Sequence, residues 1–142
     1  QKGETMDIKG TKKSDHLIGS DDMDRIFGKA GADTLIGKGG GDELVGGKGN
    51  DVLIAGAGNN YDVLEGGAGR DTFIINAETN FDGIRDFDPA KDTLILDVPG
   101  TPDQSLLEWG RPLNAGFLYY DGVKAGVLAG LPDVDIGDII LL

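Results

Sequence analysis

The sequence contains no cysteine, which excludes disulfide bridges and thiolate metal sites. Its single histidine, His16, leaves too few nitrogen ligands for a typical zinc site. No run approaches the roughly 18 apolar residues of a membrane-spanning helix, no segment resembles a signal peptide, and helix signals are poor throughout. A small extracellular domain without disulfides needs another staple, and a bound metal is one of the few available.

Basic residues are scarce. The 142 residues include 13 Lys and Arg against 25 Asp and Glu, a formal charge of -12. Such a charge disfavours nucleic acid, whose phosphates would be repelled, and favours cation binding or simple solubility. No H-E-x-x-H motif is present, and the glycine-rich stretch at Gly37–Asp42 lacks the spacing of a phosphate loop. We therefore expect no enzyme activity, although counts alone do not exclude a carboxylate pair for glycoside hydrolysis.

Glycine is abundant, with 25 copies, and it repeats with a nine-residue period. The period is marked by seven aspartates: Asp15, Asp24, Asp33, Asp42, Asp51, Asp62 and Asp71. Two residues after each aspartate stands an apolar residue, and five residues before most of them stands a glycine. Two extra residues near Asn60 and Tyr61 interrupt the series once. The units read G-x-x-G-x-D-x-(apolar)-x.

The period predicts one short strand and one turn for each unit. Asp-x-apolar-x alternates like a strand with its apolar side chain facing inward, and glycine permits the positive φ of a tight turn. Two units then make one coil of about 18 residues, and coils stack at the strand spacing of about 4.8 Å. The sequence thus predicts an all-β parallel β-roll in which aspartates of alternate units are aligned.

Aligned carboxylates repel one another and need a positive charge between them. Two charges about 5 Å apart repel by roughly 3 kcal/mol at an effective dielectric near 20, so the stack would resist folding unless a cation lay between them. Carboxylate oxygens and the main-chain carbonyls of glycine turns suit a hard ion with six to eight flexible ligands. That description fits Ca²⁺ better than Mg²⁺, which requires tight octahedral geometry.

The units resemble the RTX, or haemolysin-type, calcium-binding nonapeptide repeat G-G-x-G-x-D-x-U-x. The resemblance covers about Gly10 to Ile74 and implies a right-handed parallel β-roll with Ca²⁺ held between successive turns on each edge. Carried over residue by residue, it implies these metal-binding positions: Asp15, Asp24, Gly28, Gly31, Asp33, Gly37, Gly40, Asp42, Gly46, Gly47, Gly49, Asp51, Gly56, Gly58, Asp62, Gly66, Gly67, Gly69 and Asp71.

The resemblance implies about 3 to 5 calcium ions, one for each aligned pair. The expected pairs are Asp15–Asp33, Asp33–Asp51 and Asp51–Asp71 on one edge, with Asp24–Asp42 and Asp42–Asp62 on the other. The first two units lack glycines of the motif, so their sites are expected to be weak or empty. In the sixth unit either Asn60 or Asp62 could be the ligand, and the resumed phase favours Asp62.

The glycine period stops after Asn76, which suggests a β-roll over residues 1–76 and a β-rich cap over 77–142. Strands are expected at Phe81–Phe87, Thr93–Leu96, Leu106–Trp109, Phe117–Tyr120 and Val123–Leu128. The apolar residues suited to begin the cap are Phe73, Phe81, Phe87, Leu94 and Leu96.

The segment Gly83–Leu94 resembles the connection that follows RTX repeats in serralysin-type proteins. Its Asp86, Asp88 and Asp92 could hold another ion, or Asp88-Pro89 could be a turn with Asp92 as its partner. The ending Asp138–Leu142 resembles a type I secretion signal, and a buried final strand explains it equally well.

These patterns together predict a calcium-binding module of a secreted or cell-surface protein, whose partners are Ca²⁺ and the type I secretion machinery. The alternative is a module that binds acidic polysaccharide, in which calcium is only structural. The basic residues expected in turns could form a patch along an edge for that purpose, or could simply be solvated and temper the acidic charge. They are Lys12, Lys13, Lys29, Lys38, Lys48 and Arg70. His16 is expected to point outward. The pattern does not predict the oligomeric state.

Overall fold

The computed structural model describes residues 3–58, 60–76, 82–98, 107–110, 115–120, 123–129 and 139–142. These residues form strands, turns and bends, and no helix occurs among them. In this described part, therefore, no helical segment could cross a membrane. The predicted all-β class is confirmed.

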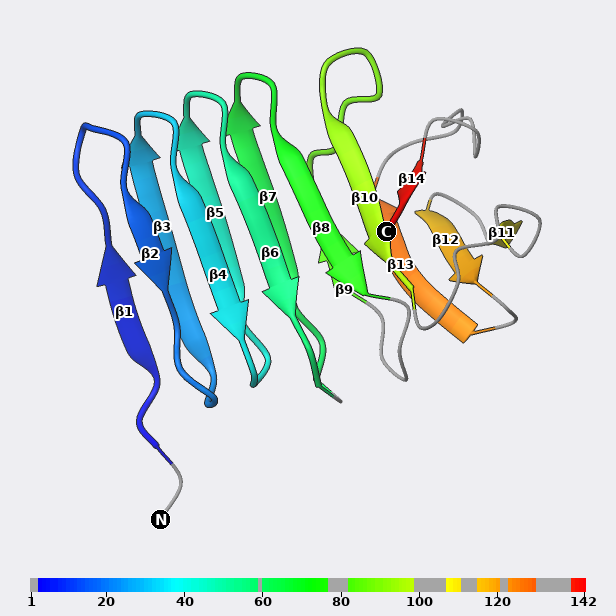
Figure 1. Cartoon of the computed structure of the whole chain (residues 1–142), viewed down its shortest axis with the longest axis horizontal. Helices are drawn as coiled ribbons and strands as arrows, with labels where there is room; N and C mark the ends of the chain where they lie inside the picture. Colours follow the sequence, from blue (N-terminus) through cyan, green and yellow to red (C-terminus); the bar gives the residue numbers. More distant parts are fainter. Residues whose placement is uncertain are drawn as a thin grey trace.

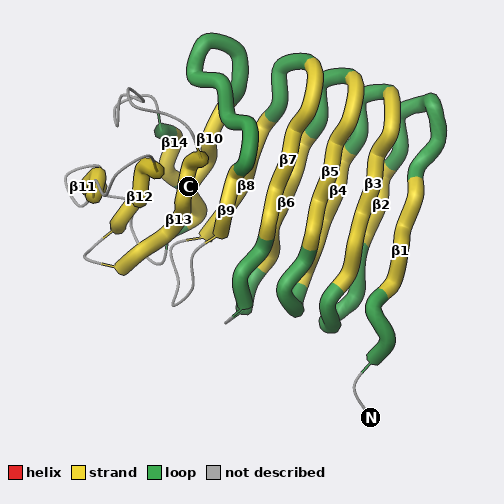
Figure 2. Tube along the Cα trace, turned by 180° about the vertical axis from the view of Figure 1, so that it is seen from behind, coloured by secondary structure: helices red, strands yellow, loops and turns green. Residues whose placement is uncertain are grey.

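The strands form two sheets that face each other along a flattened coil (Figure 1; Figure 2). The eight-stranded sheet contains, in spatial order, β1 (Met6–Lys9), β3 (Asp24–Ala30), β5 (Glu43–Lys48), β7 (Val63–Ala68), β9 (Asp82–Ile84), β13 (Val123–Ala129), β12 (Ala115–Tyr120) and β11 (Leu107–Gly110). The six-stranded sheet contains β14 (Ile140–Leu141), β10 (Thr93–Asp97), β8 (Thr72–Asn76), β6 (Val52–Gly56), β4 (Thr34–Lys38) and β2 (His16–Ile18).

From β1 to β10 the chain alternates between the two sheets, so each coil contains one strand of each. Pairing is parallel, and partners are 18 residues apart in the first coils, such as Ile26 with Leu44 and Leu35 with Leu53, and 20 or 21 apart in the later ones. Because partners carry the same motif position, the apolar residues stack into two ladders facing each other. Ile26, Leu35, Leu44, Leu53, Leu64 and Phe73 are completely buried between the sheets. This confirms the predicted parallel β-roll.

The strands run further than the sequence predicts. The pattern assigns six glycine-rich residues to each turn, yet β3 continues through Gly28 to Ala30 and β5 continues through Gly47 to Lys48. Parallel partners such as Lys29 with Gly47 extend the ladder into the motif glycines. Since glycine lacks a side chain, it weakens a strand but does not prevent its pairing.

The two-residue insertion is absorbed in one turn. Leu44 pairs with Leu64, 20 residues later, so the register of the core continues unchanged past Asn60 and Tyr61. Each core position therefore remains filled.

The chain after the repeats prolongs both sheets of the roll. Strand β9 pairs with β7, and β10 pairs with β8. Strand β13 pairs with β9 in parallel, and β12 and β11 then continue the sheet through antiparallel pairing. Phe87 packs edge-on against Phe73, with ring centroids 5.9 Å apart, and Leu94 and Leu96 are buried. The five predicted strands correspond to β9 to β13, of which β9 is shorter than expected; Phe81 lies outside the described residues.

Replacing Leu44 by Ala should lower the free energy of unfolding by about 2–5 kcal/mol, because the side chain is fully buried between Ile26 and Leu64 and the sheets cannot collapse onto the cavity. Urea denaturation with excess Ca²⁺ measures this. The control Val52→Ala removes a half-buried, outward-facing side chain and should cost clearly less. Equal losses in the two variants would contradict the two-sheet core.

Candidate metal centre

The turns of the roll lie on two edges. We call the turns at residues 10–15, 28–33, 46–51 and 66–71 the first edge, which is uppermost in Figure 1. The turns at 19–24 and 37–42, with residues 56–58 and 60–62, form the second edge. Each turn ends in a periodic aspartate at the start of the next strand. Because coils are stacked in register, the aspartates of one edge lie one above another.

A ladder of hydrogen bonds joins these aspartates. The Oδ1 atom of each accepts the backbone N–H of the aspartate one coil earlier: Asp33 from Asp15 at 2.8 Å, Asp42 from Asp24 at 2.8 Å, Asp51 from Asp33 at 2.8 Å, Asp62 from Asp42 at 2.7 Å and Asp71 from Asp51 at 2.9 Å. The five pairs expected from the sequence are thus adjacent in space.

In four of the aspartates, the second carboxylate oxygen accepts no hydrogen bond from a backbone amide. The Oδ2 atoms of Asp33, Asp42, Asp51 and Asp71 are buried and accept no hydrogen bond from protein. An ionised oxygen in that position is costly unless a cation compensates it. These orphaned oxygens fit a metal ion with oxygen ligands.

Main-chain carbonyl oxygens lie near the same Oδ2 atoms. A Cβ atom built on Gly28 would lie 2.5 Å from Asp33 Oδ2 and 2.5 Å from the carbonyl oxygen of Gly46 on the next coil. A Cβ on Gly37 would lie equally close to Asp42 Oδ2 and to the carbonyl oxygen of Ala55. The glycine leaves room beside a carboxylate and a carbonyl from two coils. Oxygens of this kind are what Ca²⁺ binds.

The remaining predicted glycines shape the turns. Gly31, Gly40, Gly47, Gly49, Gly56, Gly58, Gly67 and Gly69 all have positive φ, a region that side chains disfavour. Gly46 and Gly66 lie on the first edge in the same position as Gly28. A Cβ on Gly46 would touch Asp51 Oδ2, and one on Gly66 would touch Asp71 Oδ2. Within the described residues, no three His, Asp or Glu side chains form a metal cluster.

Burial raises the pKa of Asp42, Asp51 and Asp71 in the metal-free chain. The pKa of Asp42 rises to about 7 and that of Asp51 to about 6, first because of desolvation and then because of charge repulsion from neighbouring aspartates on the same edge. Desolvation also raises the pKa of Asp71. A bound cation would oppose both causes, since it favours the ionised form.

Three predicted positions differ from the interior ones. Asp15 and Asp24 occupy the ladder, but their Oδ2 atoms accept hydrogen bonds from Thr11 and Ser20. In the sixth unit Asp62 takes the ladder position and is buried, whereas Asn60 is exposed.

The ladder extends past the repeats through two aspartates. Asp82 Oδ1 accepts the backbone N–H of Asp62 at 3.2 Å, and Asp92 Oδ1 accepts that of Asp71 at 2.9 Å. Sequence reasoning missed Asp82 and considered Asp92 only within the following loop. The signal was present, because Asp82-Gly83-Ile84 and Asp92-Thr93-Leu94 repeat the Asp-x-apolar pattern after spacings of 20 and 21 residues.

The side chains of Asp62 and Asp82 can form a hydrogen bond when one of the two carboxyl groups is protonated. Burial, followed by the charge of Asp62, raises the pKa of Asp82 to about 8. A proton shared by two carboxyl groups relieves repulsion much as a cation would. This pair accordingly differs from those with an orphaned Oδ2.

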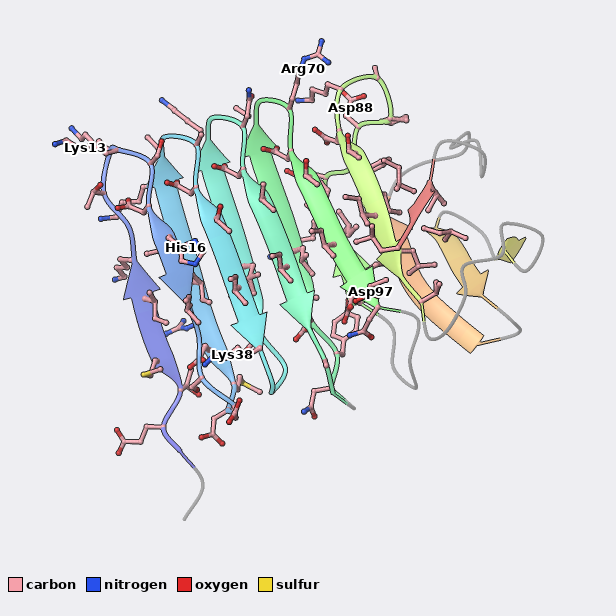
Figure 3. The ribbon with its side chains drawn as sticks, in the orientation of Figure 1. Lys13, His16, Lys38, Arg70, Asp88 and Asp97 are labelled. Atoms are coloured by element: carbon pink, nitrogen blue, oxygen red, sulfur yellow. The ribbon has the colours of Figure 1, made fainter. Side chains whose placement is uncertain are left out.

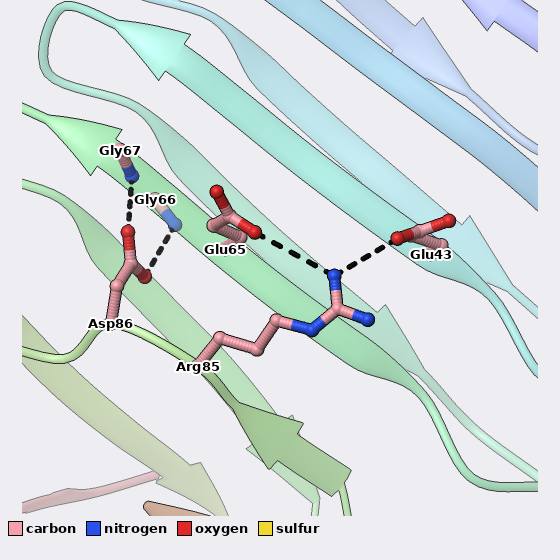
Figure 4. A network of polar contacts seen from close by, with 6 residues as sticks. All are labelled: Glu43, Glu65, Gly66, Gly67, Arg85 and Asp86. Carbon is pink, nitrogen blue, oxygen red and sulfur yellow. Dashed lines mark hydrogen bonds and ion pairs between the residues drawn. The ribbon is translucent and has the colours of Figure 1, made fainter. Parts of the chain in front are cut away.

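The loop after β9 contacts the last coils of the roll through Asp86 and Arg85 (Figure 4). Asp86 accepts the backbone N–H groups of Gly66 and Gly67 at 2.9 and 2.7 Å, while Arg85 pairs with Glu43 at 3.0 Å and Glu65 at 3.6 Å.

Asp92 Oδ2 accepts the N–H of Asp88 at 2.8 Å, which confirms the turn interpretation of this loop. Both oxygens of Asp86 and of Asp92 are thereby used by backbone amides.

Several other predictions can be compared with the structure. His16 is exposed on β2, as predicted (Figure 3). At the C-terminus, β14 pairs with β10 and Ile139 is buried, but Ile140 and Leu142 are exposed, so a final strand forms that is only partly buried. Asp138 lies outside the described residues.

Glycine turns, stacked carboxylates and parallel pairing define a β-roll with candidate cation sites along its edges. Residues 7–35 and 36–73 match the family model described as the RTX calcium-binding nonapeptide repeat, in four copies. This part of the chain belongs to that family, and repeats of this family bind Ca²⁺.

Similar solved structures include an extracellular lipase, LipA, from Serratia marcescens, with a TM-score of 0.45 and 12% identity over 100% of this chain and 41% of the lipase chain. The AlgE6R3 subunit of the Azotobacter vinelandii mannuronan C5-epimerase gives a TM-score of 0.37 and 24% identity over 92% of this chain and 80% of that chain. The AlgE6R2 subunit gives 0.35 and 26% over 94% and 91%. No curated protein matches the sequence significantly.

The metal-free chain should be more stable at pH 5 than at pH 8. The folded-state pKa values of Asp42, Asp51, Asp62 and Asp82 lie at about 6 to 8, above the unfolded value of 3.8. The folded chain therefore holds more protons, and its stability falls as pH rises through that range. Thermal unfolding followed by circular dichroism in metal-free buffer measures this. Higher stability at pH 8 would contradict the buried carboxylate ladder.

Proposed function

We propose that this chain is the calcium-dependent folding module of a secreted or cell-surface protein. Calcium binding follows from the repeats; the proposal adds that the ions decide whether the roll forms. The observation that carries it is the set of orphaned Oδ2 atoms at Asp33, Asp42, Asp51 and Asp71, each buried beside a motif glycine.

Binding and folding are coupled through the stack. Each aligned pair brings two carboxylates from neighbouring coils together, and neither coil alone presents the complete set of oxygens. A ligand that binds only the folded state stabilises it by mass action. Low calcium inside the cell would leave the chain unfolded and suited to type I export, and higher calcium outside would fold it.

Titration with Ca²⁺ should convert a largely unordered metal-free chain at neutral pH into a β-rich one, with reversal by EGTA. Mg²⁺ should not substitute, because it demands tighter octahedral geometry. Circular dichroism measures the transition. Asp51→Asn should shift its midpoint to at least about tenfold higher Ca²⁺, because Asp51 has neighbours on both sides of the first edge.

Asp97→Asn is the matched control, since Asp97 is exposed and belongs to neither ladder (Figure 3). It should leave the midpoint unchanged. A metal-free chain with the same β spectrum and melting temperature as the calcium-loaded one would refute calcium-dependent folding.

Binding of acidic polysaccharide is a second candidate function. It is favoured by the distribution of Lys and Arg side chains between the two edges. The exposed residues Lys12, Lys13, Lys29, Lys48 and Arg70 all lie on the first edge, whereas the second edge carries Lys38 with Asp21 and Asp22. Lys13 and Arg70 extend outward from the first edge in Figure 3. Among the described residues, the ion pairs use Arg25 and Arg85 and leave these cations unpaired.

Calcium would strengthen this asymmetry, because ions beside Asp33, Asp51 and Asp71 would neutralise the acidic charge of the first edge. A linear polymer of carboxylated sugars would then find a row of cations along one edge. The described first-edge turns at 10–15, 28–33, 46–51 and 66–71 contain no aromatic residue that could stack nucleic-acid bases.

Lys29 and Lys38 allow a matched test of this second candidate. Both are exposed, both follow a motif glycine, and both have positive φ (78° and 79°), but they lie on opposite edges. Lys29→Gln should weaken retention of the calcium-loaded chain on immobilised acidic polysaccharide, and Lys38→Gln should not. The salt concentration needed for elution measures this. Equal effects, or no retention of the unsubstituted chain, would dismiss the candidate.

A further inference from the structure

The first turn of each edge is built differently from the turns that follow. We call the turns at Gly10–Asp15 and Gly19–Asp24 closed turns, and those at Gly28–Asp33, Gly37–Asp42, Gly46–Asp51 and Gly66–Asp71 open turns. The open turns have an aspartate whose Oδ2 is buried without a hydrogen bond. In the closed turns, the corresponding oxygen is already occupied by donors from the same turn.

Thr11 closes the first turn with two hydrogen bonds. Its backbone N–H and its hydroxyl donate to Asp15 Oδ2 at 2.6 and 2.9 Å. The hydroxyl oxygen in turn accepts the N–H of Lys13 at 3.1 Å. A short hydroxyl side chain that accepts the N–H two residues ahead fixes a tight turn. The carboxylate is therefore satisfied inside its own turn.

Ser20 repeats this arrangement on the second edge. Its N–H and hydroxyl donate to Asp24 Oδ2 at 2.5 and 2.9 Å, and the hydroxyl oxygen accepts the N–H of Asp22 at 3.2 Å. Thr11 and Ser20 both directly follow a motif glycine, so they hold equivalent positions in consecutive units.

The backbone provides an independent distinction. In the open turns the second and fourth residues have positive φ: Lys29 and Gly31, Lys38 and Gly40, Gly47 and Gly49, Gly67 and Gly69. In the closed turns these positions are Thr11 with Lys13 and Ser20 with Asp22, and none of the four has positive φ. The peptide groups of the two turn types are thus oriented differently.

The closed turns otherwise retain the surroundings of the open ones. A Cβ on Gly10 would lie 2.8 Å from Asp15 Oδ2 and 2.6 Å from the carbonyl oxygen of Gly28, and Gly19 stands in the same relation to Asp24 and Gly37. The carboxylate and the next coil's carbonyl are in place. What differs is that amide and hydroxyl donors already occupy the carboxylate, and a cation would have to displace them.

We propose that Thr11 and Ser20 replace calcium at the first turn of each edge, so that the first metal ions bind at Asp33 and Asp42. This inference rests on the proposed calcium-dependent folding and specifies which carboxylates bind the ions. The roll then begins with a coil whose charges are compensated by hydrogen bonds alone, and the metal-dependent coils stack upon it.

Calcium stoichiometry of the full chain, measured by isothermal titration calorimetry, tests the proposal. Asp15→Asn and Asp24→Asn should leave the number of bound ions unchanged, although each disturbs a turn. Asp33→Asn and Asp42→Asn should each lower it by at least one. A lower count in Asp15→Asn or Asp24→Asn would overturn the proposal.

The reverse substitution gives a second test that does not depend on whether Asp33→Asn or Asp42→Asn folds. The double variant Thr11→Gly/Lys13→Gly gives the first turn the glycines found at Gly47 and Gly49, and it should bind one more ion than the original chain. The control Ser14→Gly changes the same turn without touching Asp15 Oδ2, and it should add none. An unchanged count in the double variant would overturn the proposal.

These outcomes are separable from failure of the proposed function. If the unsubstituted chain binds no calcium, the calcium-dependent module itself is refuted. If it binds calcium and Asp15→Asn lowers the count, calcium-dependent folding stands and only the role of Thr11 and Ser20 is lost.

Discussion

The structure depends on how it compensates the negative charge of carboxylates stacked at the spacing of parallel strands. Each coil places an aspartate directly above the one before, and one oxygen of each is used by a backbone amide of the preceding coil. The coils differ in whether the other carboxylate oxygen, Oδ2, has a hydrogen-bond partner. Left buried and unpaired, as in Asp33, Asp42, Asp51 and Asp71, it requires a cation or a proton.

The chain meets this requirement in several ways along its length. Hydroxyl and amide donors of Thr11 and Ser20 satisfy the first level of each edge. The glycine turns of the interior leave room beside the carboxylate for an ion. Beyond the repeats, Asp82, Asp86 and Asp92 accept hydrogen bonds from backbone amides.

Much of this could be predicted from the sequence because the repeat is strict. Asp at one position and an apolar residue two positions later define which side chains face inward, and Leu35, Leu44 and Leu53 are buried as expected. Asp82 was missed because the glycines that precede the periodic aspartates of the other units are absent before it. Strand lengths were underestimated because glycine was taken as a turn signal, whereas Gly47 pairs with Gly67 within the sheet.

The sequence by itself determined the period, and with it the all-β roll, the inward-facing residues and the alignment of aspartates from alternate units. Those properties follow from local alternation and from an 18-residue coil, which need no knowledge of distant contacts. Only the tertiary structure decided which aligned carboxylates lack a partner, because this depends on the donors that each turn directs at Oδ2. Thr11 and Lys29 hold the same position of the repeat, yet one lies in a closed turn and the other, with positive φ, in an open one.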